Sequence, residues 1–238
     1  MSGKILVLGG TGPAGICLLR ELLFRDHDVI AFARNPSKIP DDLKSNPKLE
    51  VVKGELTDRE QLADAVSRSS AVLSLLGPNS LLNTDPSVYY NFYVLLFGLM
   101  REHQVRRIFA MSTISVWQPG DRFSLIRWLV VALVFVVAHY GWRTARAIAR
   151  VFEEHAGGLD WTVYRIGGIP GGSDEESWRA DREDYETYEG TIGAPGWSPQ
   201  QRRAALARWL VDAVEDGKQE WIRKMPAITA LAGRAKLQ

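Results

Sequence analysis

The sequence predicts an α/β fold with a doubly wound, mostly parallel sheet that carries helices on both faces. Short runs rich in Val, Ile and Leu alternate with segments in which apolar residues recur every three or four positions. The turns between these segments are short, and glycine ends several of the runs. Repeated strand–helix units of this kind form parallel sheets, because each helix returns the chain to the edge where the next strand starts.

The predicted strands are short apolar runs without polar alternation, which is typical of parallel strands buried on both faces. The first is KILVLGG, and it is followed by DVIAFAR, LEVVKG, AVLSLLG, VRRIFAMST and LDWTVYRI. Each run ends at a glycine or at a polar or turn segment. The strands are therefore expected at residues 4–10, 28–34, 49–54, 71–77, 105–113 and 159–166.

The predicted helices combine an apolar stripe with interleaved charges, as in the first of them, where Leu19 and Leu22 flank Arg20 and Glu21. The last is expected to begin with Ser198 as its N-cap and Pro199 in its first turn. No repeat or linker divides the chain, so one domain over residues 1–238 is expected, with a substrate-side portion from about 115 to 238. The helices are expected at residues 13–27, 58–69, 88–104, 125–137, 141–155 and 198–218.

Two segments allow more than one interpretation. Residues 171–190 hold eight acidic residues and two arginines, with Trp178, Tyr185 and Tyr188 among them. We expect a solvated surface loop with aromatic anchors, and a lid over a pocket is the alternative. The helix at 125–137 is apolar but too short to span a hydrocarbon core of about 30 Å. We expect it to be buried, with a membrane-surface or oligomer-interface role as the alternative.

Composition favours a small-molecule partner over nucleic acid. The chain is 46% hydrophobic and 24% charged with a formal net charge of +1, and it has no basic excess. Cys17 is the single cysteine, so no disulfide is expected, and His103, His139 and His155 lack metal-ligand spacing, so no metal site is expected. Without a leader-like start or a transmembrane segment, a cytoplasmic monomer or homodimer is expected.

A glycine-rich turn follows the first predicted strand. Gly10, Gly12 and Gly15 form G-x-G-x-x-G, and Gly9 with the latter two forms G-x-x-G-x-x-G. A strand precedes the turn and a helix follows it, as in dinucleotide sites. The first glycines permit the tight turn, Gly12 lets a pyrophosphate approach the backbone, and Gly15 lets the helix pack closely. Exposed amides and the helix dipole favour an anion there, so the turn predicts a bound dinucleotide.

The end of the second strand indicates which dinucleotide is bound. The segment AFARNPSK holds Ala33 and Arg34 where a carboxylate would hold a ribose 2′-hydroxyl. An arginine at that place suits a 2′-phosphate, because its guanidinium pairs bidentately with phosphate oxygens. Lys38 adds a second positive charge. The expected cofactor is NADP(H), and NAD(H) is the alternative.

Six segments together resemble atypical short-chain dehydrogenase/reductases, namely the NmrA-like and flavin/biliverdin-reductase-like NAD(P)-binding proteins. They are KILVLGGTGPAG, AFARNPSKI, VVKGELTD, VLSLLGP, IFAMST and GLDWTVYRIGGI. The resemblance covers residues 4 to about 169, together with the closing helix. It implies a Rossmann-type fold and a dinucleotide site, and it is much less specific for the substrate.

The resemblance also implies site residues at matching positions. Thr11, Gly12, Pro13, Ala14 and Gly15 would line the pyrophosphate, after Gly9 and Gly10, and Arg34 with Lys38 would meet the adenosine phosphate. Glu55 and Leu56 would lie by the adenine, although the family usually has Asp at position 55. Ile166 stands where the family commonly has proline. The remaining residues implied for the nicotinamide end are Leu76, Gly77, Pro78, Ser112, Thr113, Ile166, Gly167 and Gly168.

The catalytic pair of standard family members is missing. These enzymes use Tyr-x-x-x-Lys after the fifth strand, but Tyr140 is followed four positions later by Thr144. Ser112 and Tyr140 are the catalytic candidates that remain. If residues 128–138 flank the nicotinamide, they form an apolar substrate cavity, and core packing is the alternative. The sequence therefore predicts an NADP(H)-dependent reductase of a hydrophobic or conjugated small molecule. A dinucleotide-binding regulator without turnover and a non-redox isomerase or cyclase are the alternatives.

Overall fold

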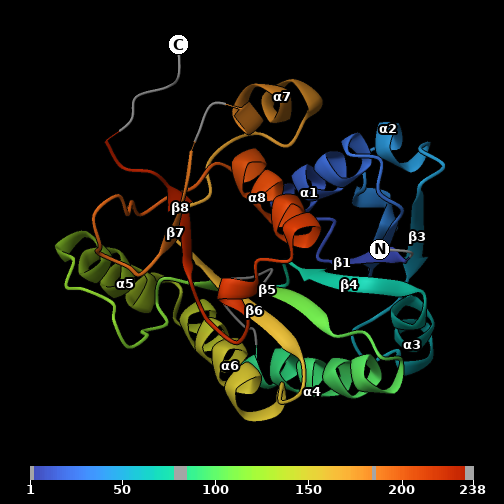
Figure 1. Cartoon of the computed structure of the whole chain (residues 1–238), viewed down its shortest axis with the longest axis horizontal. Coiled ribbons are helices and arrows are strands. Elements are labelled where there is room, and N and C mark those ends of the chain that lie inside the picture. Colours follow the sequence, from blue (N-terminus) through green and yellow to red (C-terminus); the bar gives the residue numbers. More distant parts are fainter. Residues whose placement is uncertain (1–2, 78–84, 184–185, 234–238) are drawn as a thin grey trace.

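The chain folds around one mostly parallel sheet (Figure 1), and the computed structural model describes residues 3–77, 85–183 and 186–233. Within these ranges the sheet has eight strands in the order β3-β2-β1-β4-β5-β6-β8-β7. All neighbours pair in parallel except β7 and β8, which are antiparallel. The expected doubly wound α/β fold is confirmed. The strands are β1 Lys4–Leu8, β2 Val29–Ala33, β3 Leu49–Lys53, β4 Ser69–Ser74, β5 Arg107–Thr113, β6 Asp160–Ile166, β7 Thr187–Gly190 and β8 Ala227–Ala230.

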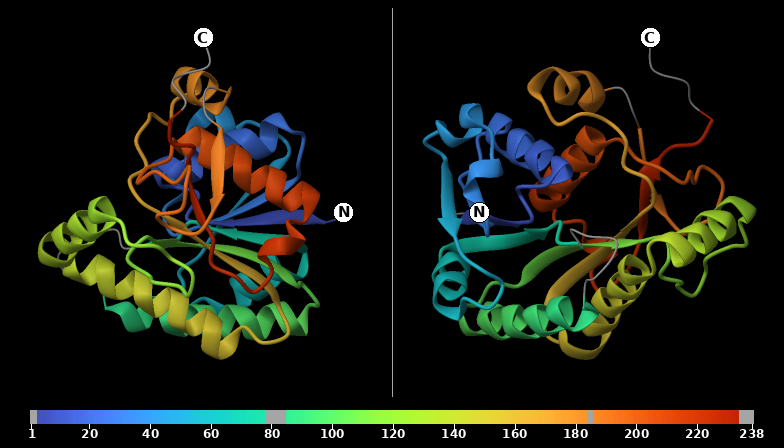
Figure 2. Two further views of the ribbon diagram at one scale, coloured as in Figure 1. Left: turned by 60° about the vertical axis from the view of Figure 1, so that its left-hand side comes forward. Right: turned by 180° about the vertical axis from the view of Figure 1, so that it is seen from behind.

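Helices cover both faces of the sheet. In Figures 1 and 2, α1, α2, α7 and α8 lie on one side of it, and α3, α4 and α6 lie on the other. Short 3-10 turns cover Pro36–Lys38 and Gln219–Trp221. The helices are α1 Pro13–Phe24, α2 Asp41–Lys44, α3 Arg59–Ser67, α4 Pro86–Glu102, α5 Leu125–Val137, α6 His139–His155, α7 Glu175–Glu183 and α8 Arg203–Asp216.

The core forms two apolar layers, one on each face of the sheet. In β1, Ile5 and Val7 join the layer beneath α1 and α8, whereas Leu6 and Leu8 join the layer above α4 and α6. Both faces of the strand are therefore buried. This explains why the sequence of β1 is a continuous apolar run rather than an alternating one.

The expected start of the last helix is wrong. The helix α8 begins at Arg203, and Ser198 is not its N-cap, because the Ser198 hydroxyl donates to the carbonyl of Ala230 at 2.6 Å. The backbone of residues 199–201, which lie between Ser198 and α8, pairs with the segment after β6 instead. The Gly168 amide donates to Pro199, and the Gln201 amide donates to Gly168. These hydrogen bonds hold residues 199–201 in an extended conformation, so the helix begins only at Arg203.

The acidic segment 171–190 is neither the solvated loop nor the lid considered above. It forms α7 and β7, and α7 packs on α8 and α1. Trp178 is only 3% exposed, which confirms it as an aromatic anchor, and Arg182 pairs with the buried Glu21 of α1 at 2.9 Å. Tyr188 donates to the Thr191 carbonyl, and Tyr185 lies outside the described residues. The buried indole and carboxylate explain why α7 packs on α1 and α8 despite its many charges.

The expectation that residues 125–137 form a buried helix is also wrong. The helix α5 is present, but none of its residues is buried. No single helix in the described ranges is long and apolar enough to cross a bilayer. The pair α5 and α6 meets that criterion only when taken together, and the two helices are bent by 113°.

Candidate functional site

The glycine turn between β1 and α1 has distinct steric requirements at its positions. Gly9 has a φ of +81°, and a Cβ there would lie 2.8 Å from the Leu75 carbonyl. A Cβ on Gly15 would lie 2.2 Å from the Gly9 oxygen, so the turn itself requires glycine at both positions. At Gly12 the nearest atom is 3.8 Å away, so the surrounding protein does not require glycine. Its place as the residue before α1 fits the close approach of a ligand to the backbone.

An apolar pocket of about 320 Å³ lies beyond the carboxyl ends of β4, β5 and β6, where α5 and α6 also form part of its wall. It brings together seven of the residues expected at the nicotinamide end, whereas Pro78 lies outside the described residues. These seven are Leu76, Gly77, Ser112, Thr113, Ile166, Gly167 and Gly168. The pocket is also lined by Met111, Ile114, Ser115, Val130, Val134, Gly141, Thr144, Ala145 and Ile148.

Two buried hydroxyl groups lie in the wall of this pocket. Ser112 donates to the Ala145 carbonyl of α6 at 3.0 Å, which leaves its oxygen free to accept. Thr144 is fully buried, and its hydroxyl has no partner among the described residues. An unpaired buried hydroxyl is unfavourable and calls for an explanation, such as a bound ligand. Sequence reasoning noted Thr144 only as the residue in the place of the missing lysine, which was the one signal available.

The structure does not bring Tyr140 to this pocket. Its side chain is 36% exposed, and the next residue, Gly141, lines the cavity instead. Tyr140 is therefore not part of the pocket wall. The catalytic role of Tyr140 stays a prediction. Ser112 and Thr144 are the polar pair that the structure places together.

The other end of the expected cofactor site lies at the carboxyl ends of β2 and β3. Arg34 follows β2, and Lys38 lies in the 3-10 turn after it; both are exposed. Sequence reasoning missed Lys53, which ends β3 directly opposite Ala33. Its position as the last residue of a parallel strand was the available signal. Arg34, Lys38 and Lys53 form no ion pair with any described carboxylate, so three free cations gather at this edge.

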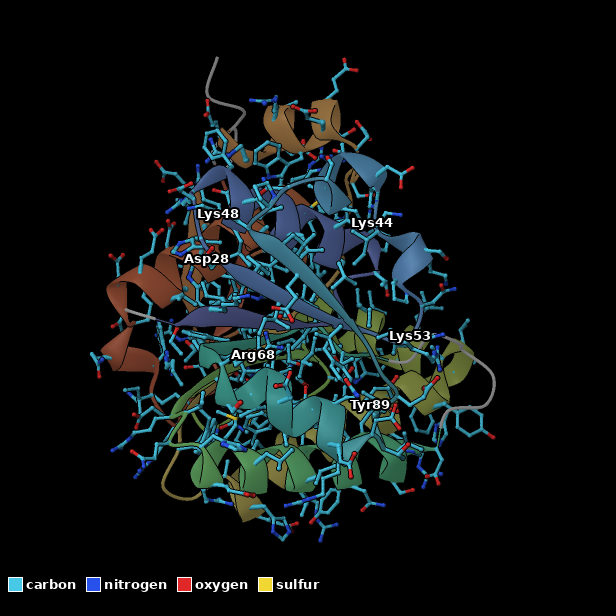
Figure 3. The ribbon with its side chains drawn as sticks, turned by 90° about the vertical axis from the view of Figure 1, so that its right-hand side faces the viewer. Asp28, Lys44, Lys48, Lys53, Arg68 and Tyr89 are labelled. Carbon is cyan, nitrogen blue, oxygen red and sulfur yellow. The ribbon has the colours of Figure 1, made fainter. Side chains whose placement is uncertain are left out.

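Tyr89 connects this edge to the pocket. Its hydroxyl donates to the Gly77 carbonyl at 2.6 Å, and Gly77 lines the pocket. Burial raises the pKa of Tyr89, and the positive charge of Arg34 opposes that shift, so Arg34 lies within electrostatic reach. Figure 3 shows Tyr89 and Lys53 together near the carboxyl end of β3.

The two residues expected beside the adenine follow β3 in a capped turn. The amide of Glu55 donates to a carboxylate oxygen of Asp58 at 2.7 Å, and the Glu55 side chain is exposed. Leu56 is partly buried and packs against the apolar layer beneath α3. The backbone around these residues is therefore fixed, whereas the Glu55 carboxylate is free to turn toward or away from a ligand.

A buried ionic cluster fixes the loop before α5. The Asp121 carboxylate accepts hydrogen bonds from Nη1 and Nη2 of Arg165 at 2.6 and 3.0 Å, and Nη1 of Arg127 lies 3.1 Å from it. Arg127 also donates to the carbonyls of Ile114 and Val116. Burial opposes ionisation of Asp121, but the hydrogen bonds and charge of Arg165 outweigh it and lower its pKa. The cluster ties the first turn of α5 to the ends of β5 and β6.

Comparison with known proteins identifies the family. A family model described as NAD(P)H-binding matches residues 9–217. The chain is 36% identical over 134 residues to the 3 beta-hydroxysteroid dehydrogenase/Delta 5→4-isomerase of Mycobacterium tuberculosis, covering 51% of this chain and 35% of that protein. It is 38% identical over 81 residues to the 3-beta-hydroxysteroid dehydrogenase of Mycolicibacterium neoaurum, covering 32% of this chain and 21% of the relative. These matches span about a third or less of the relatives' own length.

Solved structures agree on the fold. A wide-type short-chain dehydrogenase/reductase of Veillonella parvula, in complex with NADP, superposes with a TM-score of 0.70 at 18% identity, over 96% of this chain and 95% of that one. An oxidoreductase of Lactococcus lactis gives a TM-score of 0.69 at 17% identity, over 95% and 90%. The NAD(P)H cofactor expected from the glycine turn is thereby confirmed at the level of the family. The chain belongs to the NAD(P)H-binding family, as its glycine-rich motif indicates.

Proposed function

We propose that the chain is an NADP(H)-dependent reductase of a hydrophobic or conjugated small molecule. The observation that carries this proposal is the apolar pocket beyond β4, β5 and β6, whose wall contains the unpaired Thr144 hydroxyl. A mostly apolar cavity with few polar groups suits an apolar substrate held in one orientation. In this proposal the chain forms one domain, and its substrate-side portion, from about residue 115 onward, supplies α5, α6 and most of the pocket wall.

The residues present fit the cofactor from end to end. The amides of the first turn of α1 are free of intrahelical partners and suit the pyrophosphate. Arg34, Lys38 and Lys53 suit a 2′-phosphate, which favours NADP(H) over NAD(H). When bound, the nicotinamide supplies or accepts the hydride. The residues proposed to hold the cofactor are Gly9, Gly10, Thr11, Gly12, Pro13, Ala14, Gly15, Glu55, Leu56, Leu76, Gly77, Thr113, Ile166, Gly167 and Gly168.

The two buried hydroxyls would orient the substrate. The Ser112 proton is held by the Ala145 carbonyl, so Ser112 offers an acceptor, whereas Thr144 offers a donor. A donor at this place suits a carbonyl oxygen or the oxygen of a conjugated system. The apolar wall excludes water and thereby strengthens that hydrogen bond. The names of the mycobacterial relatives, which denote hydroxysteroid substrates, support an apolar substrate class.

The test is NADPH consumption against a panel of flavins, quinones, enones and aldehydes. Oxidation of NADPH with an apolar member of the panel is the expected result. Tight NADPH binding without oxidation across the panel would contradict the proposal. In that case, capture of a protein partner would indicate a regulator, and conversion of a metabolite without net redox change would indicate an isomerase or cyclase.

Thr144→Val is expected to lower kcat/KM about 10-fold while leaving NADPH binding unchanged. Valine matches the shape of threonine but removes one hydrogen-bond donor, which is worth about 1–1.5 kcal/mol. Because the Thr144 hydroxyl has no protein partner, the melting temperature should stay equal or rise. Steady-state kinetics and a thermal melt measure the two effects.

Thr162→Val is the matched control, because Thr162 is also buried but donates to the Trp221 carbonyl at 2.8 Å, away from the pocket. This variant should lose stability and keep its kcat/KM. Equal kinetics of Thr144→Val and wild type would exclude Thr144 from substrate binding.

A further inference from the structure

The outer side of α5 is an unusually large exposed apolar surface. Eight of the thirteen residues of this helix are large, apolar and exposed, and Phe123 just before it is 84% exposed. Figure 2 shows α5 projecting at the edge of the molecule. Large exposed apolar surfaces on single chains mark sites that contact another protein or a membrane. The α5 outer face comprises Leu125, Ile126, Trp128, Leu129, Leu133, Phe135, Val136 and Val137.

The inner side of α5 is anchored to the rest of the fold, and these contacts keep its outer side exposed. Arg127 is held by Asp121 and by two backbone carbonyls. Val131 packs with the small apolar cluster that contains Ile114, and Val130 and Val134 line the pocket. The helix cannot turn its outer face inward without breaking these contacts.

Arginines outnumber carboxylates around the α5 outer face. Residues 122–152 contain five arginines and no aspartate or glutamate. Arg143 and Arg146 are exposed on α6, and both line an open groove of about 850 Å³ whose wall also contains Arg150 and Glu153. Arg146 stacks on Trp142, and Arg143 acts on Asp85 only at long range. This excess of positive charge is complementary to an anionic surface.

Aromatic side chains occur near both ends of the helix. Trp117 and Trp128 are more than 60% exposed near its start, and Tyr140 follows its end. Aromatic rings with a polar atom favour the boundary between lipid headgroups and hydrocarbon. A helix of thirteen residues is about 20 Å long, so it fits in the plane of that boundary and is too short to cross about 30 Å of hydrocarbon.

We propose that the α5 outer face docks on an anionic phospholipid bilayer, with α5 lying in the plane of the interface and the arginines of α6 among the headgroups. A second copy of this chain fits the face less well. An isologous contact places the same residues on both sides, and residues 122–152 offer no carboxylate to neutralise the opposing arginines.

Docking there would place a membrane beside the substrate pocket. Val130 and Val134 line the pocket from the opposite side of α5, and a helix is about 10 Å across. An apolar substrate dissolved in lipid would then reach the pocket without crossing bulk water. This consequence rests on the proposed function, whereas the docking itself does not.

The experiment is co-sedimentation of the full chain with vesicles of phosphatidylcholine alone and of phosphatidylcholine mixed with phosphatidylserine. Wild type is expected to bind the mixed vesicles at least about tenfold more strongly, and added NaCl should reduce that preference. The triple variant Ile126→Ser, Leu129→Ser, Leu133→Ser should lose binding to both kinds of vesicle by about tenfold or more. The double variant Arg143→Glu, Arg146→Glu should lose only the preference for phosphatidylserine.

The matched control is Phe24→Ser with Val94→Ser, which removes exposed apolar side chains from α1 and α4. It should bind vesicles as wild type does. Thermal melts and NADPH binding of every variant show whether the fold is intact, independently of any turnover. Equal vesicle binding by the triple variant and wild type, or no wild-type binding to mixed vesicles, would overturn the proposal. A wild-type dimer that the triple variant converts to monomer, without vesicle binding, would assign the face to a second copy instead.

Discussion

Arg34→Glu is expected to weaken NADPH binding by about 30- to 100-fold and to leave NADH binding within about 3-fold of wild type. If Arg34 binds the 2′-phosphate as proposed, the substitution would remove charge-assisted hydrogen bonds worth about 1.5–3 kcal/mol and would add repulsion. The new carboxylate can instead accept a bond from the ribose 2′-hydroxyl of NADH. Titration of each nucleotide, followed by the fluorescence of the reduced cofactor, measures the change.

Lys48→Glu is the matched control for the change in charge. Lys48 lies just before β3, opposite the end that carries Lys53 (Figure 3), and it pairs with the exposed Asp26. Its substitution should leave the affinity for both nucleotides unchanged. Lys53→Met should weaken NADPH binding by a smaller factor than Arg34→Glu does. The assignment of these cations to the phosphate fails if Arg34→Glu binds NADPH as wild type does, or if wild type prefers NADH.

Asp121→Asn is expected to lower the free energy of unfolding by about 3–5 kcal/mol near neutral pH, because it leaves the buried Arg165 without its counter-charge. For a domain of this size, such a loss lowers the melting temperature by roughly 10 °C. Chemical denaturation of both proteins measures the difference. A loss below about 1 kcal/mol, the range of surface ion pairs, would show that the cluster does not hold this region together.

The difference in unfolding free energy between wild type and Asp121→Asn should disappear in acid. In the folded protein the pKa of Asp121 lies below its ordinary value of 3.8. The ionised carboxylate therefore contributes stability above that value, and the contribution is lost as the pH falls through the folded pKa. The stability curves of wild type and Asp121→Asn should begin to converge below about pH 4 and should meet only below the folded pKa of Asp121. Asp41→Asn is the control, since Asp41 is exposed and pairs only with Lys44, so its melting temperature should match wild type.

The glycine turn between β1 and α1 was predictable because its steric requirements are local. A Cβ at Gly9 or Gly15 would clash with atoms a few residues away in the sequence or next to the adjacent strand. The spacing of glycines in the motif therefore follows directly from this close packing. The pocket wall was predictable for a similar reason. In a parallel sheet the carboxyl ends of neighbouring strands share one edge, so Ser112 and Ile166 had to lie close together once the strands were recognised.

What the sequence did not predict depends on distant partners. Asp121 and Arg165 are separated by 44 positions, and no periodicity reveals that they form an ion pair. Lys53 gains its position beside Arg34 only through the pairing of β2 with β3. The apolar pattern of α5 indicated a helix but not its surroundings. A helix that is apolar on all sides has the same sequence pattern whether it lies in a core or at an interface.

The position of β8 between β6 and β7 also constrains the order of folding during synthesis. The parallel strands through β6 end at Ile166, but β7 has no neighbouring strand until residues 227–230 have been made. The segment at 199–201, which pairs with Gly168 in the pocket wall, also bonds to Ala230. The parallel strands β1 to β6 can therefore pair on the ribosome before the pocket wall is complete. The pocket wall around Gly168 takes its final shape only when β8 enters the sheet.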